Sequence, residues 1–189
     1  EDSWKSAVWI QPTDSGEPLR MSAIGVGAGS PKWSPDNRYL AVLSSRGGRS
    51  QVWLYDRRGG DAQQLTDFKQ GVRSFEWSPD GSQIAFCRLY MDQDYLSEMW
   101  LMDADGGNLR WIGLLGFAPR WSPDGTRFVY QSSILGDADI RTCAIDGSDD
   151  RLLFASPDAD GNPDWSPNGE RIAFVIHDIM TTGADSDIE

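Results

Sequence analysis

The sequence predicts an all-β fold built from a repeated four-stranded unit, and three observations support this. A five-residue signature, Trp-Ser-Pro-Asp/Asn-Gly/Asn, occurs at residues 33–37, 77–81, 121–125 and 165–169, always 44 residues apart. Each copy is followed by a short apolar run bounded by turn residues, which is typical of a strand buried on both faces. No segment reads as a long helix or a linker. A period of about 40–45 residues is typical of one β-propeller blade, so we predict a propeller.

Within each repeat the first two strands lie on either side of the signature. The first strand ends at the signature Trp, and the second begins two residues after the signature ends. The predicted second strands are residues 39–43, 83–87, 127–131 and 171–175. Each is rich in aromatic and branched side chains, which favour strands.

The third and fourth strands complete the repeat. Third strands are predicted at residues 7–11, 51–55, 98–102, 139–143 and 178–182, and the Asp/Gly clusters after them favour hairpin turns. Fourth strands are predicted at residues 19–22, 63–66, 110–113 and 151–154. The fourth strand is the most polar, as expected of an exposed outer edge. Residues 89–98 are predicted to form a longer loop.

Residues 1–189 are therefore one propeller region of about four blades, each with four antiparallel strands. The chain opens with a third and a fourth strand, continues with three full repeats, and closes with a first and a second strand and then a further third-type strand. The N-terminal pair is able to complete the blade that the C-terminal first and second strands begin. This pattern fits a closed four-blade ring and fits a portion of a six- to eight-blade propeller equally well. We expect the region to be truncated at both ends and to belong to a longer polypeptide.

Composition narrows the possible partners. The net charge is −12, and an acidic surface repels phosphate backbones, so no nucleic acid is expected as a partner. No apolar run approaches the roughly 20 residues of a membrane-spanning helix, so no membrane insertion is expected. The two cysteines, Cys87 and Cys143, lie in apolar strand patterns. A disulfide between them is allowed but not indicated.

The signature combines residues that favour a tight turn with a large, mostly apolar side chain, that of Trp. Pro presets φ, Asp bonds nearby backbone, and Gly or Asn accepts positive φ. One Trp per blade favours a wedge between neighbouring sheets, and a ligand-binding cage is the alternative. The four structural tryptophans are Trp33, Trp77, Trp121 and Trp165.

The residue before each Trp alternates in charge from blade to blade. These residues are Lys32, Glu76, Arg120 and Asp164. Neighbouring side chains on a strand point to opposite faces, so the charges face away from the Trp side chains. If this strand is innermost, the charges are placed to form an axial ring of inter-blade pairs, and a chance arrangement is the alternative.

Residues for catalysis, metal binding or cofactor binding are not recognisable. There is no Gly-x-Ser-x-Gly elbow, and the single histidine, His177, follows a predicted strand, which favours a strand-end role. Asp103–Gly106 and Asp158–Gly161 begin like calcium loops but lack the distal Glu, so we interpret them as turns. No zinc spacing, Walker loop or dinucleotide fingerprint occurs.

The repeat resembles the propeller repeat shared by TolB and the prolyl oligopeptidase family. The resemblance rests on an aromatic strand followed by Asp-x-x-Gly-Gly, Gln-Leu-Thr, the signature and an Ile-Ala-Phe strand, and it covers essentially the whole chain. Residues 50–81 are most similar to the N-terminal propeller of acylaminoacyl-peptidase-like and dipeptidyl-peptidase-like members. The chain departs from the pattern at residues 112–113, which are Ile-Gly in place of Leu-Thr, and at residues 141–143, which are Arg-Thr-Cys in place of an aromatic strand.

The resemblance implies a non-catalytic propeller that gates access of short peptides to an α/β-hydrolase domain of the same parent chain, a serine peptidase. Catalytic residues of that family lie in the hydrolase domain, so none carry over to this sequence. The alternatives are a TolB-like periplasmic propeller that binds a protein or peptide partner, and a free-standing binding module. The implied compartment is cytoplasmic for the peptidase and periplasmic for the TolB-like protein.

Overall fold

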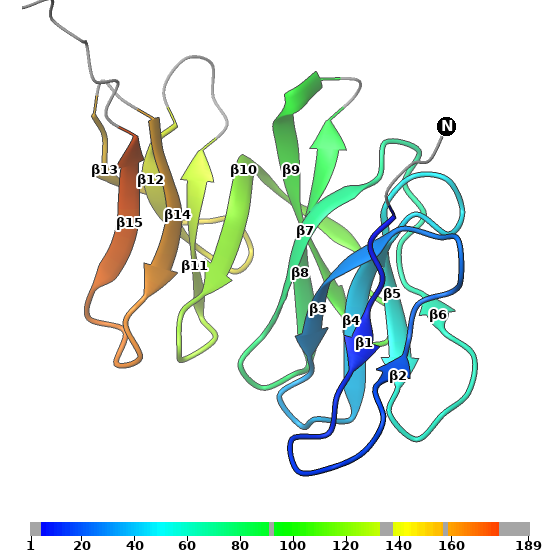
Figure 1. Ribbon diagram of the computed structural model, residues 1–189. Coiled ribbons are helices and arrows are strands. Elements are labelled where there is room, and N and C mark those ends of the chain that lie inside the picture. Colours follow the sequence, from blue (N-terminus) through cyan, green and yellow to red (C-terminus); the bar gives the residue numbers. More distant parts are fainter. Residues whose placement is uncertain (1–4, 91–92, 133–137, 157–158, 178–189) are drawn as a thin grey trace, which may run out of the picture.

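Four groups of antiparallel strands stand side by side in an open row (Figure 1). The computed structural model describes residues 5–90, 93–132, 138–156 and 159–177, which form fifteen strands and no helix. The all-β, propeller-type architecture is confirmed, and the row of blades is not closed into a ring. In the residues so described there is no helix long and apolar enough to cross a membrane.

Each complete blade has its first strand on one side and its fourth on the other. The row begins with a two-stranded half blade and continues with a four-stranded blade, a seven-stranded sheet and a second half blade. The half blade at the start is β1 (Trp9–Ile10) with β2 (Leu19–Arg20), and the four-stranded blade is β3 (Ala28–Trp33), β4 (Tyr39–Ser44), β5 (Gln51–Asp56) and β6 (Gln63–Gln64). The seven-stranded sheet is β7 (Val72–Trp77), β8 (Gln83–Tyr90), β9 (Gln93–Asp103), β10 (Arg110–Trp121), β11 (Arg127–Ser132), β12 (Ile140–Ala144) and β13 (Arg151–Phe154), and the last half blade is β14 (Ala159–Trp165) with β15 (Ile172–His177).

The seven-stranded sheet consists of two blades that share one long strand. The first part of β10 pairs with β9, and its second part pairs with β11. The predicted fourth strand at residues 110–113 and the first strand of the next repeat are therefore one continuous element. Gly113 lies inside this strand, where the register with β9 shifts between Trp111 and Leu115, and its φ of 85° is one that only glycine adopts readily.

The predicted loop at residues 89–98 is wrong. Strands β8 and β9 extend into this range, and Leu89 pairs with Ser97. An antiparallel hairpin satisfies the backbone groups that an irregular loop leaves open, which explains the extension. The predicted strand at residues 178–182 lies outside the described residues.

The core lies between neighbouring blades. One cluster joins Leu54 and Leu65 of the first complete blade to Phe75, Trp77 and other residues of the second. A second cluster joins the second blade to the third in the same way. Each sheet therefore buries its apolar faces against its neighbours, and one signature Trp lies in each of these two clusters.

Backbone and side-chain hydrogen bonds close each signature turn in the same way. In the second copy, Gly81 N donates to Ser78 O at 2.9 Å and Gly81 has a φ of 73°. The buried Ser78 hydroxyl donates to Asp80 Oδ1 at 2.6 Å and accepts a hydrogen bond from Gln83 N at 2.9 Å. The hydroxyl–carboxylate bond lowers the pKa of Asp80. The side-chain oxygens of Ser78 and Asp80 all take part in hydrogen bonds within this turn, so the turn is a local structural unit.

Candidate functional site

Three of the four alternating charges meet across three blades. Lys32 Nζ lies 2.7 Å from Glu76 Oε2, and Arg120 Nη1 donates to the same oxygen from the other side. Asp164 is exposed and pairs with no cation among the described residues; its Oδ1 accepts a hydrogen bond from Trp165 N. A single carboxylate therefore bridges two cations from its two neighbouring blades. The closed axial ring stays a prediction, because the described blades form an open row.

Three of the four charged residues line a hollow between the first strands. β7 contacts both β3 and β10, and β10 contacts β14, so the first strands gather on one side of the row. The hollow has a volume of about 400 Å³, and its charged lining residues are Glu76, Arg120 and Asp164. Its remaining lining comes from the signatures: Trp33, Pro35, Trp77, Ser78, Pro79 and Trp121. Volumes of this size are typical of small-ligand pockets.

A β-bulge lies just before each of these charges, and the sequence interpretation missed it. The strand register shifts between Gly29 and Lys32, and it shifts again in β7, β10 and β14. Three of the bulges hold a residue at positive φ directly before a proline: Ser30, Ala118 and Asn162. Proline inside a strand is confined to edges and bulges. These three bulges could therefore have been predicted from three prolines in the sequence, Pro31, Pro119 and Pro163. Bulges re-aim side chains, and these ones precede the charged positions by two residues.

The signature tryptophans link each blade to the preceding one. The indole N–H of Trp77 donates to Lys32 O at 3.3 Å, and that of Trp121 donates to Glu76 O at 3.4 Å. The N–H of Trp165 donates to Arg120 O at 3.2 Å. Trp77 and Trp121 are buried, with 6% and 8% of their surface exposed. Trp77 and Trp121 therefore pack between neighbouring blades, as an inter-blade wedge does.

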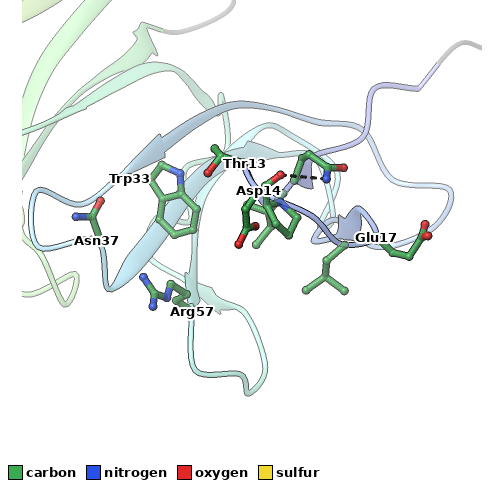
Figure 2. Close-up of a pocket in the computed structure, with 10 residues that line it drawn as sticks. Thr13, Asp14, Glu17, Trp33, Asn37 and Arg57 are labelled. Carbon is green, nitrogen blue, oxygen red and sulfur yellow. Dashed lines mark hydrogen bonds between the residues drawn. The ribbon is translucent and has the colours of Figure 1, made fainter.

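Trp33 is the exception, because no complete blade precedes it. It is 39% exposed and lines a pocket of about 810 Å³. Figure 2 shows its indole ring between Asn37 on one side and the Thr13–Asp14 segment on the other, with Arg57 nearby. Ile10 and Leu19 of the first half blade add apolar surface to the same pocket.

The remaining sequence candidates occupy structural positions. Cys87 and Cys143 are buried free thiols in one core cluster, and burial raises the pKa of each to about 12. His177 is the last residue of β15. Asp103–Gly106 forms a turn, with Gly106 N donating to Asp103 O at 2.9 Å. Within the described ranges, no group of three His, Cys, Asp or Glu residues is placed to hold a metal ion.

Comparison with known proteins agrees with this geometry. The family model of the TolB beta propeller domain matches residues 2–177. The chain belongs to the TolB β-propeller family. Among solved structures, this TolB-type propeller is similar to TolB from Acinetobacter baumannii, with a TM-score of 0.74 and 24% identity over 93% of the chain and 44% of that protein.

Two further proteins with similarity to this chain are named as peptidases. An uncharacterized peptidase of Bacillus subtilis, YuxL, is 30% identical over 51% of this TolB-type chain. An acylaminoacyl peptidase from Pyrococcus horikoshii matches the fold with a TM-score of 0.61 and 16% identity over 81% of the chain. The chain spans 16% of the Bacillus protein and 29% of the Pyrococcus protein. Both relatives are therefore much longer than the propeller described here.

Proposed function

We propose that this TolB-type chain is the non-catalytic, substrate-gating propeller of a serine peptidase of the prolyl oligopeptidase family. The observation that supports it best is the hollow beside the first strands, where Glu76 is held between Lys32 and Arg120. In this proposal the hollow is part of the opening through which substrates pass. Charged groups around such an opening are suited to select short peptides, whose terminal charges are close together. The similarity to a Bacillus peptidase supports the same proposal.

In this proposal the inter-blade ion pairs keep the opening narrow. The Lys32, Glu76 and Arg120 side chains are 31%, 23% and 40% exposed, so each pair contributes at most about 1 kcal/mol. Because breaking pairs this weak costs little free energy, the charged side chains separate and pair again reversibly. An opening with such pairs admits a short peptide and excludes a folded protein.

The first test uses the polypeptide in which this propeller is joined to the expected hydrolase domain. Glu76→Gln removes the acceptor of both ion pairs. We expect it to raise kcat/KM for a long peptide relative to a short acyl-peptide, with kcat for the short one unchanged. Glu170→Gln, at an exposed position in the fourth signature turn, is the matched control. An unchanged ratio of the two rates in Glu76→Gln contradicts gating by these pairs.

The second test uses the 189-residue chain alone. We expect no hydrolysis of acyl-peptide or dipeptide substrates above a blank, because the proposal places the catalytic residues in the other domain. Robust turnover that a serine-directed inhibitor abolishes is the result that contradicts a non-catalytic role.

The second candidate function is a TolB-like platform that binds a protein partner, and membership of the TolB propeller family favours it. The two candidates differ in what the hollow accepts. A gating propeller changes the size selectivity of a peptidase when Glu76 is replaced. A binding platform instead loses affinity for its protein partner and has no peptidase activity to alter.

A further inference from the structure

Arg120 is the cation among the described residues that line the hollow, and its side chain is 40% exposed. Lys32 pairs with the same Glu76 oxygen but does not line the hollow. Within the described ranges the Arg120 side chain has one acceptor, Glu76 Oε2, and it uses Nη1 for this bond. A guanidinium carries several N–H donors in a planar fork, whereas an ammonium is a compact point charge. The other N–H groups of Arg120 are therefore able to bind a second acceptor.

The charge around Glu76 is not balanced. Glu76 supplies a single carboxylate to two cations, so the three side chains together carry a net positive charge. Asp164 lies in the same lining but forms no ion pair with Arg120 in the described part of the chain, and its Oδ1 accepts a hydrogen bond from Trp165 N at 3.0 Å. An anionic group at Arg120 thus meets a guanidinium that Glu76 neutralises only in part. Because Asp164 repels a second negative charge, a ligand with a single carboxylate fits best.

The backbone positions Arg120 together with the ion pair. The register of β10 with β11 shifts between Phe117 and Arg120, and Ala118 in this bulge has a φ of 46°. A bulge re-aims the side chains beside it. The carbonyl of Arg120 also accepts the indole N–H of Trp165 at 3.2 Å, which ties this residue to the next blade. We therefore expect Arg120 to keep its place when the charge of Glu76 is removed.

Other donors in the lining are already in use. The indole N–H groups of Trp77 and Trp121 donate to backbone carbonyls of the preceding blade. The Ser78 hydroxyl donates to the carboxylate of its own turn. The signature prolines in the lining have no N–H to offer. A ligand in this hollow of about 400 Å³ therefore meets one cationic anchor beside tryptophan and proline side chains.

We propose that Arg120 binds the C-terminal carboxylate of a short peptide in this hollow, through the N–H groups that Glu76 leaves open. Pairs of a guanidinium with a carboxylate are among the strong, charge-assisted hydrogen bonds of proteins. The end of a short peptide brings such a group into a space of this size, whereas the middle of a long chain lacks it. The choice of a peptide rests on the proposed gating function, and the choice of a carboxylate rests on the side chains described above. An acidic side chain is the other source of a carboxylate, and the peptides used in the test distinguish the two.

Isothermal titration calorimetry of the 189-residue chain with three acetylated tripeptides tests the proposal. N-acetyl-trialanine carries a terminal carboxylate, and N-acetyl-trialanine amide differs from it only by lacking that charge. We expect the amide to bind about 10-fold more weakly, as is typical when a hydrogen-bonded charged group is lost at a partly exposed site. The third peptide, N-acetyl-Ala-Glu-Ala amide, carries its carboxylate on a side chain and is expected to bind as weakly as the amide. Equal affinities for the acid and the amide, or no binding of the acid, overturn the proposal. Binding of the Glu peptide as tight as that of the acid overturns the assignment to a peptide terminus.

Variants of Arg120 show whether the preference comes from its guanidinium. Arg120→Gln is expected to bind the acid and the amide equally, and Arg120→Lys, which keeps the charge but not the fork, is expected to keep less than a third of the preference. Arg151→Gln removes an exposed, ion-paired arginine of β13 and is the matched control, with the wild-type preference retained. Far-UV circular dichroism checks that all three variants fold. A wild-type preference for the acid in both Arg120 variants contradicts the proposal.

The outcome is separable from that of the gating test. When Glu76→Gln changes the rate ratio of long and short peptides but the acid and the amide bind alike, gating stands and the carboxylate site fails. When the acid is preferred through Arg120 but the rate ratio is unchanged, the carboxylate site stands and gating fails.

Discussion

Trp77→Ala provides the sharpest test of the inter-blade wedge. Trp77 is 6% exposed and packs in the cluster between the first and second complete blades. Truncation of a buried Trp to Ala removes about 3–5 kcal/mol from the free energy of unfolding. It also leaves Lys32 O without its indole donor, which is worth about 1 kcal/mol. The sum of these two contributions is the upper limit of the expected decrease in the free energy of unfolding.

The repeat supplies its own matched control. Trp33 holds the same signature position but is 39% exposed and belongs to none of the core clusters of the described residues. Trp33→Ala is therefore expected to cost less than half as much as Trp77→Ala. Trp77→Phe keeps a six-membered aromatic ring but loses the fused five-membered part of the indole together with its N–H, so its expected cost is about 1–2 kcal/mol.

Urea unfolding, followed by far-UV circular dichroism, measures these differences. The linear-extrapolation slope should stay constant across the three variants, because the unfolded surface is nearly the same. Equal losses for Trp33→Ala and Trp77→Ala, or a Trp77→Ala midpoint equal to that of wild type, refute the wedge.

Three further predictions concern charge, pH and thiols. Glu76→Gln is expected to lower stability by about 1–2 kcal/mol at low ionic strength and by less in high salt, as ΔTm in a salt series shows, since partly exposed pairs are screened. The Ser122 hydroxyl lowers the pKa of Asp124, so its stabilisation is present above about pH 4 and is lost as pH falls through the folded-state pKa. Asp124→Asn, which copies Asn168 of the fourth signature, should make the acid limb of a stability–pH profile shallower, and an unchanged profile contradicts this. Burial raises the pKa of Cys87 to about 12, so a thiol reagent should react with it only after unfolding, and fast modification of the native chain at neutral pH would show that the core is open.

The period of 44 was sufficient to predict most of the strands. The second strand of the first repeat, predicted at residues 39–43, is observed as Tyr39–Ser44, and its third strand, predicted at residues 51–55, is observed as Gln51–Asp56. These strands are determined locally, by apolar runs between turn residues. The turns were predictable for the same reason, because the Ser, Pro, Asp and Gly of the signature act on their own backbone.

The prediction was weakest where two repeats meet. The fusion of a fourth strand and a first strand into β10 depends on the pairing of that strand with both β9 and β11. Such pairing is non-local, so no window of sequence contains it. The hairpin across residues 89–98 was missed because its polar residues are typical of a loop when considered without their cross-strand partners.

The candidate site, too, was only partly predictable from the sequence. The sequence by itself determined which residues repeat: a charge and then a Trp before every signature turn, on opposite faces of one strand. Only the tertiary structure decided that Glu76 accepts from both neighbours, that Asp164 accepts from none of the described cations, and that Trp33 is exposed where Trp77 is buried. The physical reason is that identical repeats have identical local energetics. What distinguishes Trp33 from Trp77 is the presence or absence of a neighbouring blade, and this contact between sheets does not exist until the chain folds.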